Sequence, residues 1–124
     1  ADGQPVDLTT GYANVLWQGD VCSAALRSLE LAASPARALN VTGPETLSIR
    51  HAALRFGELL GKDVTFAGEE NGMGYLSDGM VANSLFGNPT VPVGRLIEWI
   101  AHWIAIGGES LGKPTHFETQ DGKY

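Results

Sequence analysis

The three histidines of this 124-residue chain are the first side chains to test for metal binding or acid–base chemistry. His51, His102 and His116 lie far apart in the sequence, and none is accompanied by cysteine or carboxylate at metal-ligand spacing. We therefore interpret all three as ordinary structural histidines.

Two adjacent carboxylates and two serines could also take part in catalysis. Glu69 and Glu70 are neighbours and point apart, so a solvated loop explains them better than a catalytic acid–base pair. Ser48 and Ser77 lie outside the Gly-x-Ser-x-Gly sequence that presents a nucleophile, and we predict that serines here cap helices. The residues alone therefore predict no catalytic set.

Charge and composition exclude several classes of partner. The net charge is −6 and the eight lysines and arginines are dispersed, which disfavours nucleic acid and anionic membranes. Gly72-Met73-Gly74 precedes no lysine and does not join a first strand to its helix, so it is a poor phosphate loop. No apolar run approaches the roughly 20 residues that span a bilayer. The single cysteine, Cys22, cannot form an internal disulfide, so a cytoplasmic protein is expected.

Trp17 keeps two interpretations open. It lies at the end of a predicted strand over residues 15–18, where open α/β sheets bind ligands, but a core tryptophan is the slightly favoured alternative. A helix from Val21 to Ala33 should follow, with Asp20 as its N-cap. The helical spacing predicts a buried face, and the small thiol of Cys22 is expected to lie on it. That face contains Cys22, Ala25, Leu26, Leu29 and Ala33.

The remaining elements alternate between strand and helix. Extended or alternating residues predict an edge strand within 4–8 and strands over 37–42 and 63–66. Apolar periodicity predicts helices over 49–60, around 80–86 and over 93–106, the last one buried on more than one side. We expect residues 67–75 to form a glycine-rich loop. The predicted fold is α/β, a small mixed sheet of three to four short strands covered by about four helices.

Four short sequences together resemble a known family. They are Asn14 to Val21, Leu39 to Gly43, Thr46 to Arg50 and Asp78 to Pro89, followed by an apolar helix. In this order they resemble the C-terminal half of the NAD-dependent epimerases and dehydratases, the extended short-chain dehydrogenase/reductase family. The resemblance covers residues 3–106. It implies that residues 1–108 are the substrate-binding lobe of a Rossmann-type enzyme, with residues 109–124 as a C-terminal tail.

The resemblance also implies what a longer parent protein would supply. The family's dinucleotide fingerprint and Tyr-x-x-x-Lys pair belong to an N-terminal Rossmann domain, and no tyrosine here has a lysine four residues later. We therefore expect this chain to be inactive alone, with no catalytic residue, no metal and no cofactor of its own. In the parent, the missing domain would hold NAD or NADP, and a homodimer is one expected assembly.

The expected substrate is a sugar or nucleotide sugar. Its first wall would be Tyr12, Asn14, Trp17 and Gln18, and its second the loop from Glu69 to Tyr75. A non-catalytic relative that senses a dinucleotide or binds another small molecule is the alternative.

The chain departs from the family pattern at informative positions. Trp17 replaces a usual histidine, Gly19 a usual aspartate and Val81 a usual lysine. Ala13-Asn14 and Glu69-Glu70-Asn71 stand where many nucleotide-sugar enzymes have arginines that hold the diphosphate. These differences count against a nucleotide sugar.

Overall fold

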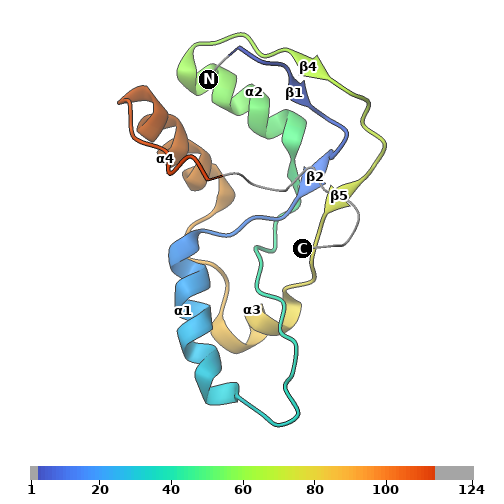
Figure 1. Cartoon of the computed structure of the whole chain (residues 1–124), viewed down its shortest axis with the longest axis vertical. Helices are drawn as coiled ribbons and strands as arrows, with labels where there is room; N and C mark the ends of the chain where they lie inside the picture. Colours follow the sequence, from blue (N-terminus) through green and yellow to red (C-terminus); the bar gives the residue numbers. More distant parts are fainter. Residues whose placement is uncertain (1–2, 114–124) are drawn as a thin grey trace.

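Two groups of elements make up residues 3–113, the part of the chain that the computed structural model describes (Figure 1). One group holds α1 (Gln18–Ser28), the 3-10 turn η1 (Leu29–Leu31) and α3 (Met80–Phe86). The other holds α2 (Ile49–Leu60), α4 (Val93–Ala105) and five two-residue strands. The predictions for His116 and for most of the 109–124 tail fall outside the described residues.

The strands form two small sheets instead of the single sheet predicted. They are β1 (Val6–Asp7), β2 (Tyr12–Ala13), β3 (Leu47–Ser48), β4 (Phe66–Ala67) and β5 (Gly74–Tyr75). β1 pairs in parallel with β4. β2 lies between β3, which is antiparallel to it, and β5, which is parallel to it. The α/β class, the mixed pairing and the four α-helices are confirmed for the described residues.

Two predicted strands are wrong. Residues 15–17 and 37–42 form no ladder, and Gln18 already belongs to α1. The two segments still lie beside each other, because a β-carbon at Gly43 would overlap the Val15 carbonyl oxygen. The Thr42 hydroxyl donates to the Asn14 carbonyl oxygen at 3.4 Å. The two segments are therefore neighbours in space, but they do not form the predicted strands.

α2 has the predicted bounds, because both of its ends are set by local chemistry. The Ser48 hydroxyl accepts a hydrogen bond from the backbone N–H of His51, and Ile49 begins the helix. Gly61 ends it with φ 63°, the left-handed conformation that glycine adopts without strain. The predicted cap at Ser77 is wrong for α3, because Gly79 is its N-cap residue and makes no side-chain cap hydrogen bond. Asp78 Oδ1, from the residue before Gly79, accepts from the Met80 N–H at 2.9 Å.

α1 starts three residues earlier than predicted, and Asp20 does not cap it. Trp17 is the N-cap residue, without a side-chain cap hydrogen bond, and Asp20 lies in the first turn. The Asp20 carboxylate instead accepts hydrogen bonds from the Thr90 hydroxyl and N–H and from the Val91 N–H. It therefore joins α1 to the segment that leads into α4.

The predicted buried face of α1 is exposed, and this corrects the interpretation of Cys22 as a buried thiol. Cys22 is exposed, and Leu26 and Leu29 are each 70% exposed. Inward contacts come from the other side of the helix. Ala24 is buried, and Arg27 donates to the Phe86 carbonyl oxygen of α3 at 2.7 Å. Only one side of α1 is covered within the described residues.

α4 is likewise covered on one side, not on several as predicted. Its buried residues, Val93, Ile97 and Ala101, recur at one-turn intervals, and α4 packs against α2. Trp99 and Trp103 are exposed. No helix in residues 3–113 is long and apolar enough to cross a membrane.

Candidate functional site

The pairing of β2 with β5 brings the two predicted substrate walls together. Tyr12 lies opposite Gly74 and Ala13 opposite Tyr75 in a parallel register. The Asn14 N–H continues the pairing by donating to the Tyr75 carbonyl oxygen at 3.1 Å. Two segments about sixty residues apart in the sequence therefore lie side by side (Figure 1). One contains Tyr12 and Asn14, and the other contains Tyr75.

The Asn14 side chain joins three segments. Its Nδ2 donates to the Ser77 carbonyl oxygen at 2.7 Å and to the Gly43 carbonyl oxygen at 3.3 Å. Its Oδ1 accepts from the Ser77 N–H at 3.1 Å. Both amide hydrogens are used, so Asn14 positions the backbone around it and has no donor left for a ligand.

A polar groove of about 410 Å³ opens beside Asn14. It lies between the segment around Gly43 and the start of α3. Its lining is Asn14, Gly43, Pro44, Thr46, Leu76, Ser77, Asp78, Gly79, Met80, Asn83 and Asn88. Hydroxyl, amide and carboxylate groups predominate among its polar side chains, and these suit a ligand that both donates and accepts hydrogen bonds.

Sequence reasoning missed most of this groove. Ser77 was considered only as a helix cap, and Thr46, Asp78, Asn83 and Asn88 entered only as members of the family-like sequences. The available signal was the order of the family-like sequences, because all four contribute residues to the lining. Isolated asparagines and threonines carry no such signal, because whether they line a groove depends on which segments the fold brings together.

Of the six predicted site residues, Asn14 lines the groove and the other five do not. Tyr12 and Tyr75 lie next to it along the chain, in the β2–β5 pair. The Trp17 ring meets the Trp99 ring edge to face, with centroids 5.8 Å apart and an interplanar angle of 72°. Gln18 is an exposed residue at the start of α1, and Glu69 is exposed between β4 and β5. Neighbouring Glu70 forms a salt bridge with Arg50 at 3.2 Å. The structure thus brings Tyr12, Asn14 and Tyr75 together, but not all six predicted residues.

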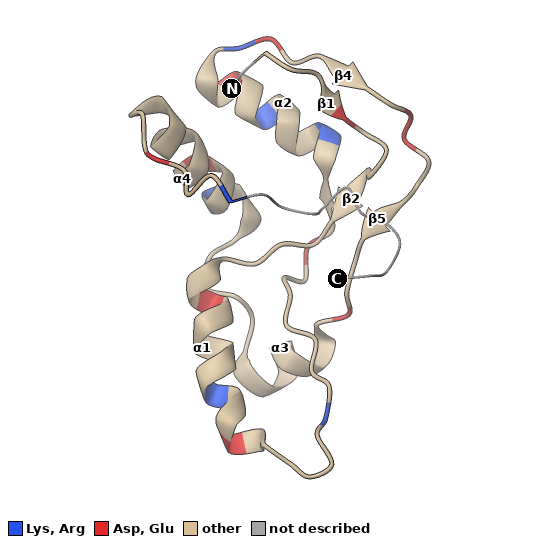
Figure 2. Ribbon diagram, in the orientation of Figure 1, with Lys and Arg blue, Asp and Glu red and all other residues tan. Residues whose placement is uncertain are grey.

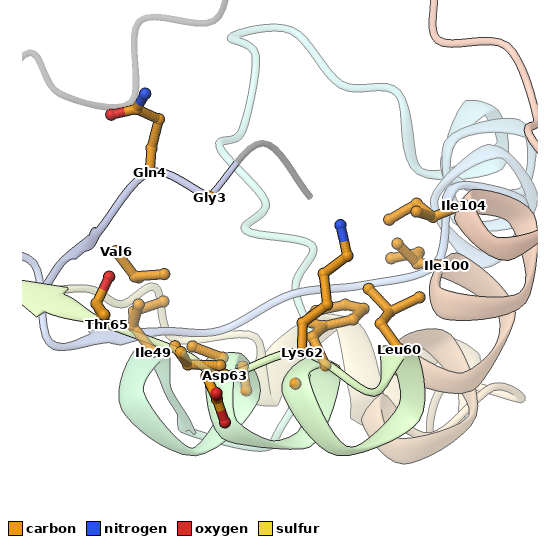
Figure 3. A pocket seen from close by; sticks show the side chains of 15 residues that line it. Gly3, Gln4, Val6, Ile49, Leu60, Lys62, Asp63, Thr65, Ile100 and Ile104 are labelled. Carbon is orange, nitrogen blue, oxygen red and sulfur yellow. The ribbon is translucent and has the colours of Figure 1, made fainter.

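A second groove, of about 470 Å³, is apolar and contains none of the predicted site residues. It lies between α2, α4 and the β1–β4 pair. Figure 3 shows Ile100 and Ile104 of α4 beside Leu60 on one side, with Val6 and Ile49 on the other. The charged side chains at this groove are those of Lys62 and Asp63. Its lining offers apolar contact rather than acid–base chemistry.

Charged groups form no catalytic or metal-binding cluster in the part of the chain that is described. Figure 2 shows acidic and basic residues interspersed along the chain. No three His, Cys, Asp or Glu residues within 3–113 gather as metal ligands. His51 and His102 are both exposed.

Asp20 is one carboxylate whose titration the fold alters. Burial raises the pKa of Asp20, but hydrogen bonds from the Thr90 hydroxyl, the Thr90 N–H and the Val91 N–H outweigh it, so the pKa lies below the ordinary value. Asp20 contacts the turn before α4 and not a substrate groove, so its ionised form supports structure.

The glycine-rich loop does not have the geometry of a dinucleotide site. Gly72 adopts φ 76°, but the loop runs into β5, and α3 begins only at Met80. A pyrophosphate site needs a helix N-terminus directly after the glycines. The described residues therefore do not fit a nicotinamide dinucleotide at this loop.

No protein-family model matches this chain, and no curated protein matches it.

Proposed function

We propose that the chain is the substrate-binding domain of an NAD(P)-dependent epimerase or dehydratase that acts on a sugar or nucleotide sugar. The observation that carries the proposal is the parallel pairing of β2 with β5. It joins the two segments that the family resemblance assigns to the substrate cleft, at the edge of the polar groove. Hydride transfer is the chemistry that the cofactor would supply in the parent protein.

The proposed partner is a dinucleotide-binding Rossmann domain. Its docking surface would be the uncovered apolar side of α1, η1 and α4, which includes Leu26, Leu29, Trp99 and Trp103. Large exposed apolar surfaces of this kind are typical of interfaces. The glycine-rich loop does not fit the dinucleotide, which supports assigning the cofactor to the partner domain.

In this proposal the described residues bind and orient the substrate and exclude water. Asn14 holds the backbone of residues 43 and 77 in place, and the exposed phenol of Tyr12 is available for hydrogen bonding. Trp17 does not line the groove, so it would contribute a flat apolar surface if the partner domain extends the substrate cleft to the start of α1. Gln18 and Glu69 would contribute polar contacts only if the partner domain brings the substrate to them.

The experiment uses the parent protein with NAD and with NADP, supplied in turn with free sugars and nucleotide sugars. We expect a substrate-dependent epimerised, dehydrated or oxidised product, followed by NMR of the sugar and by cofactor absorbance. Absence of turnover with every substrate, in protein shown to bind the cofactor, would contradict the proposal. In active protein, Trp17→Ala should raise KM, and unchanged kinetics would remove Trp17 from the site.

A further inference from the structure

We infer that the polar groove beside Asn14 takes the substrate as a neutral polyhydroxyl compound, a free sugar or cyclitol, and not as a nucleotide diphosphate sugar. The inference rests on the proposed function and narrows its substrate class. It follows from the hydrogen-bonding groups left unused in the groove and from the sign of its charge.

The unused groups suit hydroxyls. Within residues 3–113, no hydrogen bond engages the side chains of Thr46, Ser77, Asn83 and Asn88, all of which line the groove. A hydroxyl and a primary amide can each donate and accept, which is what a sugar hydroxyl requires of its partner. Asp78 adds an acceptor, since only its Oδ1 is used by the Met80 N–H.

The groove has no cation for a phosphate. Asp78 is its charged residue, and no lysine or arginine among the described residues lines it. In the first turn of α3, the Met80 N–H is already used by the Asp78 carboxylate, which also places a negative charge at that turn. A diphosphate placed here would meet a carboxylate instead of the guanidinium forks that usually bind it.

Several arginines are also committed elsewhere. Arg27 donates to the Phe86 carbonyl oxygen and lies over the Phe86 ring, 4.9 Å from its centroid. Arg50 pairs with Glu70 and also lies over the Phe66 ring, at 4.5 Å. Neither arginine lines the groove, and moving either guanidinium to a phosphate there would break these contacts.

The test titrates the full chain with glucose, myo-inositol and UDP-glucose and follows backbone amides by two-dimensional NMR. We expect glucose or myo-inositol to shift the amides of residues 76–80 and 83. Because neither compound is charged, the affinity should be nearly unchanged between low and high salt. UDP-glucose should bind no more tightly than the free sugar.

Matched variants locate the site. Asn88→Ala should weaken binding of the neutral compound by about threefold to tenfold, the loss expected for one hydrogen bond. Asn40→Ala, at an exposed asparagine outside the groove, should leave the affinity unchanged. Asp78→Asn should improve UDP-glucose binding relative to glucose by removing the repulsive charge.

Other outcomes would overturn the inference. One is that neither neutral compound shifts the groove amides in folded protein, and another is that UDP-glucose binds there much more tightly than glucose. Turnover of only a nucleotide sugar by the parent would leave the proposed function intact and refute the neutral-ligand inference. If a neutral compound binds in the groove but the parent shows no NAD(P)-linked turnover, the proposed enzymatic function is contradicted. The inference that the groove binds a neutral polyhydroxyl compound is then still supported.

Discussion

The Trp17 indole ring occupies the space that a β-carbon on Gly19 would need. These are two of the positions at which the sequence departs from the family pattern that the proposed function assumes. The contact links the departures, because an indole folded onto the first turn of α1 tolerates only hydrogen at position 19. Since the same ring meets Trp99, the pair also fixes the start of α1 against α4.

Gly19→Ala should therefore displace the Trp17 ring. An alanine in a helix normally stabilises by about 0.5–1 kcal/mol relative to glycine. Here the overlap should cancel that gain and cost the Trp17–Trp99 contact, worth about 0.5–1.5 kcal/mol. We expect a lower free energy of unfolding and changed tryptophan fluorescence, measured by urea titration.

Gly94→Ala is the matched control for this variant. Gly94 is the second residue of α4, as Gly19 is of α1, and a β-carbon there would meet no atom within 4 Å. We expect Gly94→Ala to stabilise the chain. Equal gains from both substitutions would show that the Trp17 ring does not depend on Gly19.

The sequence predicts helices here better than it predicts strands. α2 could be placed to the residue because Ser48 and Gly61 set its ends through local hydrogen bonds and backbone conformation. Residues 37–42 have a strand-like pattern but no ladder, because pairing depends on distant segments. Likewise, the pairing of β2 with β5 decides which candidate site residues meet, and neither segment alone specifies it.

Apolar periodicity was also an incomplete guide to burial. It identified an apolar face on α1, but the fold covers the opposite side, through Ala24 and Arg27. Periodicity shows that a helix has a face to bury, not which partner covers it. Within the described residues, α2 covers one side of α4, whereas Trp99 and Trp103 of α4 and Leu26 of α1 stay exposed.

Asp20→Asn should lower the free energy of unfolding at neutral pH, and this loss should become smaller at acid pH. Because the folded pKa of Asp20 lies below its unfolded value, the carboxylate contributes stability above the ordinary aspartate pKa of about 3.9. That contribution is lost as pH falls through the folded pKa. The melting temperatures of wild type and variant, measured from pH 7 downward, should therefore converge at the acid end.

Asp63→Asn serves as the comparison for Asp20→Asn. Asp63 is exposed, and its carboxylate has no hydrogen-bond partner among residues 3–113. Its substitution should shift the melting temperature little at any pH. The difference in melting temperature between wild type and Asp20→Asn could instead stay constant down to the lowest pH. That result would show that the contacts of ionised Asp20 do not cause the difference.

Asn14→Asp should loosen the junction of three segments. The carboxylate can still accept from the Ser77 N–H, but it cannot donate to the carbonyl oxygens of Gly43 and Ser77. Leaving the part-buried Gly43 oxygen unpaired should cost about 1–3 kcal/mol in the free energy of unfolding, whereas the exposed Ser77 oxygen can bind water instead. Asn40→Asp makes the same chemical change at an exposed site and should cost much less. Equal losses would show that the Asn14 contacts do not stabilise the fold.

Leu26→Glu should separate folding from domain docking. Leu26 is 70% exposed, so a charge there should change the free energy of unfolding of this chain by less than about 0.5 kcal/mol. If the uncovered side of α1 packs against a dinucleotide-binding domain, the same charge should prevent the two domains from co-purifying when they are expressed as separate chains. Ile97→Glu, at a buried position of α4, should instead unfold this chain itself. Undiminished co-purification of Leu26→Glu would exclude this side of α1 from the docking surface.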